Sequence, residues 1–273
     1  MKLKKFLIAF GFMLLSIKEV ESQTIGSAVA CLLNAAYENK EAAYQYCKRA
    51  AEQGHAVAQN ALGDMYSNGD GITRNYLQAL NWYKLAAKQG HDDSQFKLAL
   101  LYDNGLGVQQ DFKEAVKWYK LAAEQGNEQA QFFLALKYDS GKGIEKNYSE
   151  AIRWYTMSAK QGNPSAQFNL GVAYSNGINV EKNLTEAYKW YKESAEQGFV
   201  KAQHGLASLY HNGAGVMRND IKAYMWLNLA AIDGDSNIVK HRDIVASILT
   251  SQEIMQAQKL SSECKKKNFK NCN

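Results

Sequence analysis

The chain has 273 residues, of which 46% are hydrophobic and 22% charged, and its formal net charge is +5. This composition is normal for a folded protein and excludes a disordered chain. One proline stands beside 20 glycines, which favours helices separated by glycine and predicts an all-α fold.

The first residues have the pattern of a secretory signal. A basic stretch from Met1 to Lys5 precedes an apolar run from Phe6 to Ile17, and Val20 and Ser22 are acceptable at the two cleavage-determining positions. We expect residues 1–22 to be removed and the mature chain to be secreted or periplasmic. The run is shorter than the roughly 20 residues of a membrane span, so no stable span is expected after cleavage; retention of the segment as an anchor is the alternative.

Four cysteines are placed near the two ends of the mature chain. Cys31 and Cys47 fall in the first helical stretches, and Cys264 and Cys272 fall in the last one. An even number in an exported chain indicates disulfides, with three pairings possible and local pairing at each end favoured. Each bridge would contribute on the order of 3 kcal/mol at an end where a repeat array frays. A redox pair or metal thiolates are the alternatives, but the C-x-x-C spacing is missing.

The body of the chain repeats every 36 residues. In the first unit the recurring residues are Leu62, Tyr66, Ala79 and Trp82, and each returns at the same interval in four further units. A glycine closes each unit, at Gly54, Gly90, Gly126, Gly162, Gly198 and Gly234.

Each unit is predicted to contain two helices, because apolar and small residues recur at intervals of three and four. A glycine such as Gly69 can end the first helix in the left-handed conformation. Asn75 and its equivalents Asp111, Asn147, Asn183 and Asn219 are good N-caps for the second helix. Three residues further on, Gln78, Glu114, Glu150 and Glu186 are predicted to complete capping boxes, whereas Lys222 breaks this pattern.

No helix pair can bury its apolar surface alone, so the units are expected to stack. The predicted fold is an α-solenoid of about 5.5 helix-turn-helix repeats, a right-handed superhelix with a concave face formed by the first helix of each unit. Residues 23–54 would form N-terminal capping helices with a partial repeat, and residues 55–234 the five full repeats. Residues 235–273 would form C-terminal capping helices, where Thr250 and Glu253 offer a capping box, and a basic tail.

In the first helix of each unit, the recurring leucine faces the core. Side chains on the opposite side of that helix are predicted to face a partner. Apolar residues in the middle units would form the floor of a groove for a peptide or helix, or they would pack on the adjoining second helices. The candidates are Asn60, Asp64, Asp93, Phe96, Lys97, Leu100, Gln129, Phe132, Leu136, Phe168, Asn169, Lys201 and His204.

The C-terminal tail carries five lysines against one glutamate from Lys259 onward. The simplest interpretation is a solvated helix end, an acidic partner or surface is the alternative, and binding to nucleic acid is not expected. His204 and His211 lie two turns apart without an acidic or thiol partner in register, so no metal site is predicted. We expect no cofactor.

The unit Ala-Gln-x-x-Leu-Gly/Ala-x-x-Tyr-x-x-Gly-x-Gly-Val followed by Ala-x-x-Trp-Tyr-x-x-Ala-Ala-x-x-Gly resembles the Sel1-like repeat, a relative of the tetratricopeptide repeat. The match covers roughly residues 36 to 235. Departures are Asn179, in place of the second loop glycine, and Ser158 and Ser194, in place of the first alanine of their pairs.

The resemblance implies an exported bacterial scaffold or adaptor that binds a protein or peptide on the concave face, in envelope signalling or host contact. The rival implication is a penicillin-binding, β-lactamase-like or peptidoglycan-binding protein, as in cysteine-rich members of the family. Ser262 and Lys265 spell a Ser-x-x-Lys motif, but no Ser-Asp-Asn or Lys-Thr-Gly accompanies it. We therefore expect no enzyme and name no catalytic residue.

Overall fold

The computed structural model describes residues 40–272, which form two compact units. Unit 1 contains residues 40–130 and 142–144, and unit 2 contains residues 131–141 and 145–272. The predicted signal peptide and Cys31 lie outside the described residues. None of the helices between residues 40 and 272 has the length and apolar character needed to span a membrane.

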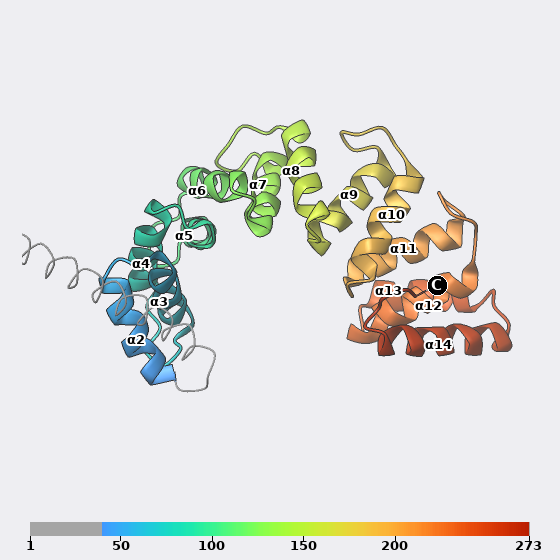
Figure 1. The fold of residues 1–273 in the computed structure, drawn as a ribbon. Coiled ribbons are helices and arrows are strands. Elements are labelled where there is room, and N and C mark those ends of the chain that lie inside the picture. The colour runs from blue at the N-terminus through green and yellow to red at the C-terminus, as the bar shows by residue number, and fades with distance from the viewer. Residues whose placement is uncertain (1–39, 273) are drawn as a thin grey trace, which may run out of the picture. The chain divides into compact units, whose positions relative to one another are not determined.

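Every regular element in the described part of the chain is a helix, which confirms the predicted all-α repeat fold (Figure 1). Unit 1 has α2 (Lys40–Glu52), α3 (Ala56–Asn68), α4 (Tyr76–Lys88), α5 (Asp92–Asn104) and α6 (Phe112–Glu124). Unit 2 has most of α7 (Glu128–Ser140), then α8 (Tyr148–Lys160), α9 (Pro164–Asn176), α10 (Leu184–Ala195), α11 (Val200–Asn212), α12 (Asp220–Ala230), the 3-10 turn η1 (Ala231–Asp233), α13 (Ser236–Ala246) and α14 (Ser251–Lys266). We call the first helix of each repeat, α3, α5, α7, α9 and α11, the A helix, and the second helix the B helix.

The helix boundaries follow from the capping residues. The Asn75 side chain accepts a hydrogen bond from the backbone N–H of Gln78 at 3.0 Å, and the other predicted N-caps act in the same way. Gly69 ends α3 with φ 81°, where its N–H donates to the carbonyl of Met65. These short-range signals account for the regular helix length in every repeat.

The predicted capping boxes at Glu114 and Glu186 are wrong. The Glu114 carboxylate accepts a hydrogen bond from the Trp118 indole at 2.9 Å and pairs with Lys117. Glu186 likewise pairs with a residue further along its helix, Lys189. A cation or indole one turn ahead is therefore the partner of these two carboxylates, whereas a complete capping box is present at Thr250 and Glu253 of α14.

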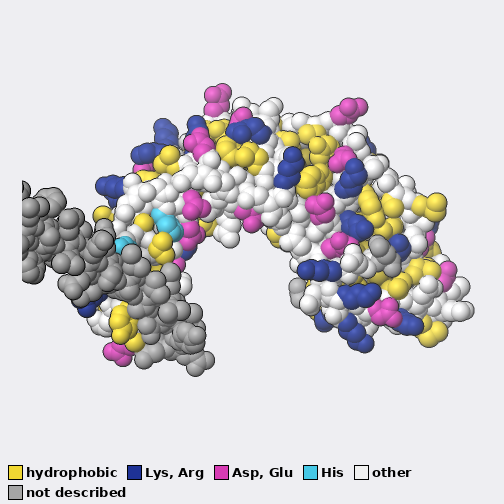
Figure 2. Space-filling model, viewed as in Figure 1, with side chains coloured by type: hydrophobic (Ala, Val, Ile, Leu, Met, Phe, Trp, Pro, Cys, Tyr) yellow, Lys and Arg dark blue, Asp and Glu magenta, His cyan; other side chains and the backbone are white. Residues whose placement is uncertain are grey.

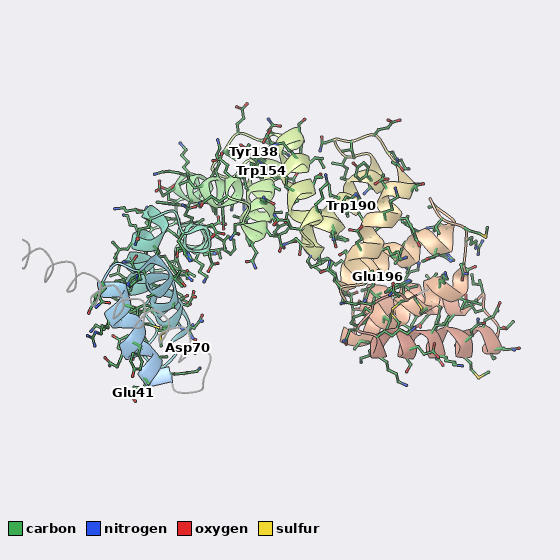
Figure 3. The ribbon with its side chains drawn as sticks, viewed as in Figure 1. Glu41, Asp70, Tyr138, Trp154, Trp190 and Glu196 are labelled. Atoms are coloured by element: carbon green, nitrogen blue, oxygen red, sulfur yellow. A yellow bond between two sulfur atoms is a disulfide. The ribbon has the colours of Figure 1, made fainter. Side chains whose placement is uncertain are left out.

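The core is built from the recurring positions. Leu62 and Leu134 are both 0% exposed, as are Ala86 and Ala122, whose small side chains let neighbouring helices approach. Trp154 also lies in the core, at 3% exposed (Figure 3), and its indole nitrogen has no hydrogen-bond partner among residues 40–272, in contrast to that of Trp118. Buried positions therefore recur from one repeat to the next, and the last repeats share one apolar cluster with the C-terminal cap.

Buried glutamines connect successive helices. The Gln59 side chain donates to the carbonyl of Ala51 at 3.1 Å and accepts from Gln89 at 2.8 Å. Gln167 and Gln197 in unit 2 are bonded in the same way. A buried amide with both groups paired stabilises the stack, since an unpaired one would carry a desolvation cost of about 1–3 kcal/mol.

The C-terminal cap is crosslinked. Cys264 and Cys272 form a disulfide with a Cα–Cα distance of 5.1 Å. Cys47 of α2 is also disulfide-bonded, but the pairing of Cys31 stays a prediction because that residue lies outside the described part of the chain.

Candidate functional site

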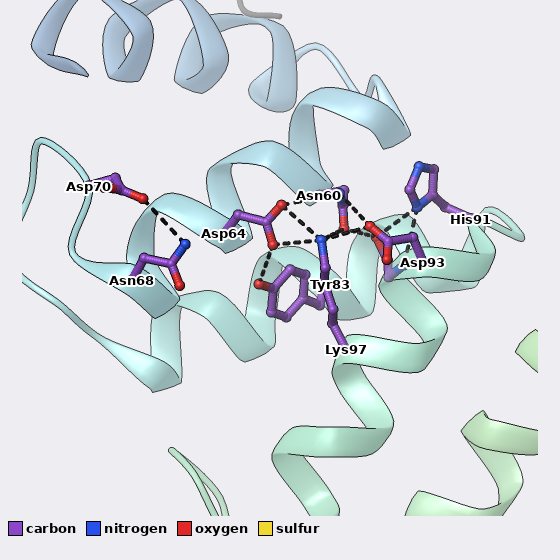
Figure 4. A network of polar contacts seen from close by, with 9 residues as sticks. Asn60, Asp64, Asn68, Asp70, Tyr83, His91, Asp93 and Lys97 are labelled. Carbon is purple, nitrogen blue, oxygen red and sulfur yellow. Dashed lines mark hydrogen bonds and ion pairs between the residues drawn. The ribbon is translucent and has the colours of Figure 1, made fainter. Parts of the chain in front are cut away.

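In unit 1 the predicted partner-facing residues form one polar cluster on α3 and α5 (Figure 4). The Lys97 ammonium lies 2.7 Å from an oxygen of Asp64 and 2.7 Å from an oxygen of Asp93. Asn60 donates to Asp93 at 3.1 Å, and the Ser94 hydroxyl donates to Asn60 at 2.9 Å. The cluster joins two successive A helices through side chains about 33 residues apart in sequence.

The base of this cluster is the buried phenol of Tyr83, from the B helix α4. Its hydroxyl donates to Asp64 at 2.7 Å. Burial, and then the negative charge of Asp64, raise the pKa of Tyr83 well above its ordinary value. Tyr83 therefore stays a hydrogen-bond donor at physiological pH and holds the Asp64 carboxylate in place.

Beside the cluster lies a hollow of about 720 Å³, which we call the polar hollow; it is lined by Asp64, Tyr83 and Lys97 together with Arg74 and Leu100. Arg74 is exposed, and no carboxylate pairs with it among residues 40–272. Two cations and several amide and hydroxyl groups thus face one opening, a surface suited to hydrogen-bonding groups of a ligand.

Unit 2 has a hollow at the equivalent repeat position, 72 residues further along, with different chemistry. This apolar hollow has a volume of about 260 Å³ and is lined by Leu136, Ile152, Val172 and Ile178, with Asn169 among its polar groups. Leu136 is the counterpart of Asp64, and Asn169 is the counterpart of Lys97. A recess is therefore present at the same place in both repeats, but different side chains line it.

The irregular loop at Asn179 contributes to this hollow. At the equivalent Gly107, an added Cβ would lie 2.5 Å from the backbone of Tyr76, so only glycine allows that approach. Asn179 has a Cβ and a positive φ of 59°, and it lines the apolar hollow with Tyr148 of the B helix α8.

The predicted groove-floor phenylalanines pack on B-helix tyrosines. Phe96 is 5% exposed and lies 6.0 Å from the ring of Tyr119. Phe132 lies 6.0 Å from Tyr155, and Phe168 is placed similarly against Tyr191. These three side chains therefore lie between helices. Phe96 is buried, whereas Phe132 and Phe168 are half-buried and keep some exposed surface.

Residues 31–55, 56–91, 92–127, 128–163, 164–199 and 200–235 each match the family model of the Sel1 repeat. The chain belongs to the Sel1 repeat family. Members of this family are generally protein-interaction scaffolds and are typically not enzymes.

Three solved structures of similar chains are compared by sequence identity, coverage and TM-score. A Sel1 repeat protein from Oxalobacter formigenes is 30% identical, with 85% of this chain and 94% of that chain covered and a TM-score of 0.75. The protective antigen c5321 of uropathogenic Escherichia coli is 27% identical over 86% of this chain and 73% of that chain, with a TM-score of 0.41. A Sel1 repeat protein from Klebsiella pneumoniae is 24% identical over 74% and 99%, with a TM-score of 0.47. A comparison with curated protein sequences gives no significant match.

Three further residues that the sequence predicts to face a partner lie away from the two hollows of this Sel1 repeat chain. Gln129 and Lys201 are exposed on α7 and α11. His204 of α11 is half-buried, and its Nε2 lies 2.9 Å from Nδ1 of His241 on α13. His204 therefore joins the last repeat to the C-terminal cap, a contact that the sequence did not reveal because the repeat phase ends before His241.

The histidines at this junction contact one another across α11 and α13. No group of three or more metal-ligating side chains is present among residues 40–272. His241 contacts His204 on one side and lies 5.9 Å from the ring of His211 on the other, and His211 is bonded to Asp220. Burial lowers the pKa of both His204 and His241.

Proposed function

We propose that this protein is an exported adaptor that binds a protein or peptide partner on its A helices, at the polar hollow and the apolar hollow. The observation that supports this proposal most is the change of side chains at equivalent positions. Core residues such as Leu62 and Leu134 return unchanged, whereas Asp64 and Leu136 differ completely. A fixed scaffold with variable lining is the arrangement that gives repeat proteins their specificity.

The two hollows define the chemistry expected of the partner. The apolar hollow has the size and lining to take one large aliphatic or aromatic side chain, the type of residue that contributes most to binding interfaces. The polar hollow offers Lys97 and Arg74 as donors and Asp64 as an acceptor. We expect a partner segment with an apolar anchor and a separate polar stretch.

Export is supported by the cysteines and by the sequence pattern of residues 1–22. Cys264 and Cys272 are crosslinked and Cys47 is also disulfide-bonded, and stable disulfides are typical of the periplasm and the exterior. There the adaptor would act in envelope signalling or in contact with a host.

The test is affinity capture from envelope extracts with residues 23–273, disulfides intact. Leu136→Asp and Lys97→Glu change one hollow each, and Lys84→Glu changes an exposed lysine on the B helix α4 as a matched control. A partner that is retained by the wild type and the control but lost with either hollow variant supports the proposal. Equal capture by all four proteins contradicts it, provided that circular dichroism shows the variants to be folded.

A further inference from the structure

A third hollow, separate from the A-helix face, lies between the end of α12 and the helices α13 and α14. Its volume is about 390 Å³. Two cations line it, Arg242 and Lys265, with the polar side chains of Asn228, Gln258 and Ser262. None of the described residues that line it is acidic. The Ser262 and Lys265 pair of the Ser-x-x-Lys motif thus belongs to a positively charged recess.

The sequence builds one wall of this recess from a single helix face. Gln258, Ser262 and Lys265 are spaced by four and three residues, which places them on the same side of α14. The neighbouring Ser261 hydroxyl is within hydrogen-bond distance of the carbonyl of Met225 on α12, at 3.1 Å. The wall is therefore held against α12 before any ligand arrives.

The disulfide fixes the same wall at its C-terminal end. Cys264, directly before Lys265, is 2% exposed and bonded to Cys272. A lysine next to a crosslinked, buried residue has a backbone position that does not fray, and pre-organisation of this kind reduces the entropy lost when a ligand binds.

The cations of the recess are incompletely neutralised. Arg242 uses Nε and Nη2 on one oxygen of Asp243, which is itself 61% exposed. The Lys265 side chain makes no hydrogen bond or ion pair with any residue from 40 to 272. Figure 2 shows lysine and arginine side chains gathered over the C-terminal helices, and from Lys259 onward the only acidic residue is Glu263.

We infer that this recess binds an oxyanion, the phosphate or carboxylate group of a ligand. A guanidinium presents a planar pair of donors to such a group, an ammonium adds a point charge, and the side-chain amides and hydroxyl supply neutral donors. The inference does not depend on the partner-binding function of the A helices. Among the described residues, Asp243, which is paired with Arg242, and Glu263, which follows Ser262, are acidic neighbours of the lining, but neither lines the recess itself.

The experiment is an amide-resolved NMR titration of the disulfide-intact protein with inorganic phosphate, and separately with citrate, against sodium chloride at matched ionic strength. We expect saturable shifts of the Ser262 and Lys265 amides with at least one oxyanion and none with chloride. Tighter binding of phosphate would identify a phosphoryl ligand, and tighter binding of citrate a carboxylate ligand. Shifts that are linear and equal in all three salts would overturn the inference.

Two variants distinguish a site from diffuse charge. Lys265→Gln removes a cation of the recess, and Lys259→Gln removes an equally exposed cation of the same helix that does not line it. We expect Lys265→Gln to weaken oxyanion binding roughly tenfold, the effect of one charged hydrogen bond, and Lys259→Gln to change it by less than about twofold. Equal weakening by both variants would mean general electrostatic attraction and would refute the site.

Discussion

The polar hollow of unit 1 and the apolar hollow of unit 2 occupy the same place in the repeat, 72 residues apart, but the charged A-helix side chains of the first are replaced in the second. Asp64 and Lys97 in the first correspond to Leu136 and Asn169 in the second. Beneath both lies a buried tyrosine on the following B helix, Tyr83 or Tyr155, whose pKa is raised by burial. The recurring core residues thus fix the position of each hollow. The residues that line it can vary because they contribute little to the free energy of folding.

The largest effect should come from the recurring core and should be equal in the two units. Leu62→Ala and Leu134→Ala each remove a side chain that is 0% exposed, so each should lower the free energy of unfolding by about 2–5 kcal/mol. Urea denaturation followed by circular dichroism measures this loss. A large loss of stability in only one unit would contradict the conclusion that the same recurring core residues support both hollows.

The next largest effect should distinguish the tyrosines. Tyr83→Phe removes a hydroxyl that donates to the Asp64 carboxylate at 2.7 Å, and we expect a loss of about 1–2 kcal/mol. Tyr155→Phe should cost less, because Leu136 replaces the carboxylate at the equivalent place. The same denaturation experiment applies, and equal losses would show that the Tyr83 hydrogen bond contributes nothing beyond packing.

A smaller effect is expected at the lining itself. Lys97→Ala removes the cation between Asp64 and Asp93, but these carboxylates are 35% and 42% exposed and water screens them. The stability loss should therefore be about 1 kcal/mol or less, and Asn169→Ala in unit 2 should be nearly neutral. Thermal melting at low and at high salt measures both; a loss that is large and unaffected by salt would contradict the description of Lys97 as a lining residue.

The smallest effect is a pH dependence that only unit 2 should show. Burial, and then the neighbouring His204 and His211, lower the folded-state pKa of His241, and burial lowers that of His204 against the attraction of Asp235. A lowered histidine pKa means that the unfolded chain binds the proton more readily, so this stability is complete above about pH 6.5 and is lost as the pH falls below it.

Hydrogen exchange of α13 between pH 7.5 and pH 5.5 tests this pH dependence. We expect faster opening of α13 at the lower pH, after correction for the intrinsic exchange rate, and no such change in α5. His241→Gln should reduce the difference between the two pH values, and His204 accounts for the remainder. An unchanged pH response in that variant would assign the effect to other groups.

The sequence predicts the repeats, the N-caps and the helix ends, because these depend on residues within one turn of each other or on a strict period. Asn75 and Gly69 are examples, and both act in the structure as their residue type suggests. Glu114 shows the limit, since two partners compete for its carboxylate and only the three-dimensional arrangement decides between them.

The lining of the hollows could be placed on the A helices from the sequence, but its contacts could not. Lys97 pairs with Asp64 on a different helix, and His204 meets His241 beyond the last repeat, where periodicity no longer gives the register. Phe96 and its equivalents recur every 36 residues, as core residues do and as residues of a binding face would. The pattern alone therefore could not decide that they pack on B-helix tyrosines.

The central claim is that a partner occupies the A-helix face of both units. The most direct measurement is hydrogen–deuterium exchange of the protein with and without the captured partner. The account predicts slower exchange in α3, α5, α7 and α9 and in the loop around Asn179, with the B helices unchanged at exposed residues such as Leu85 and Leu121. Protection confined to the B helices or to the C-terminal cap would contradict it.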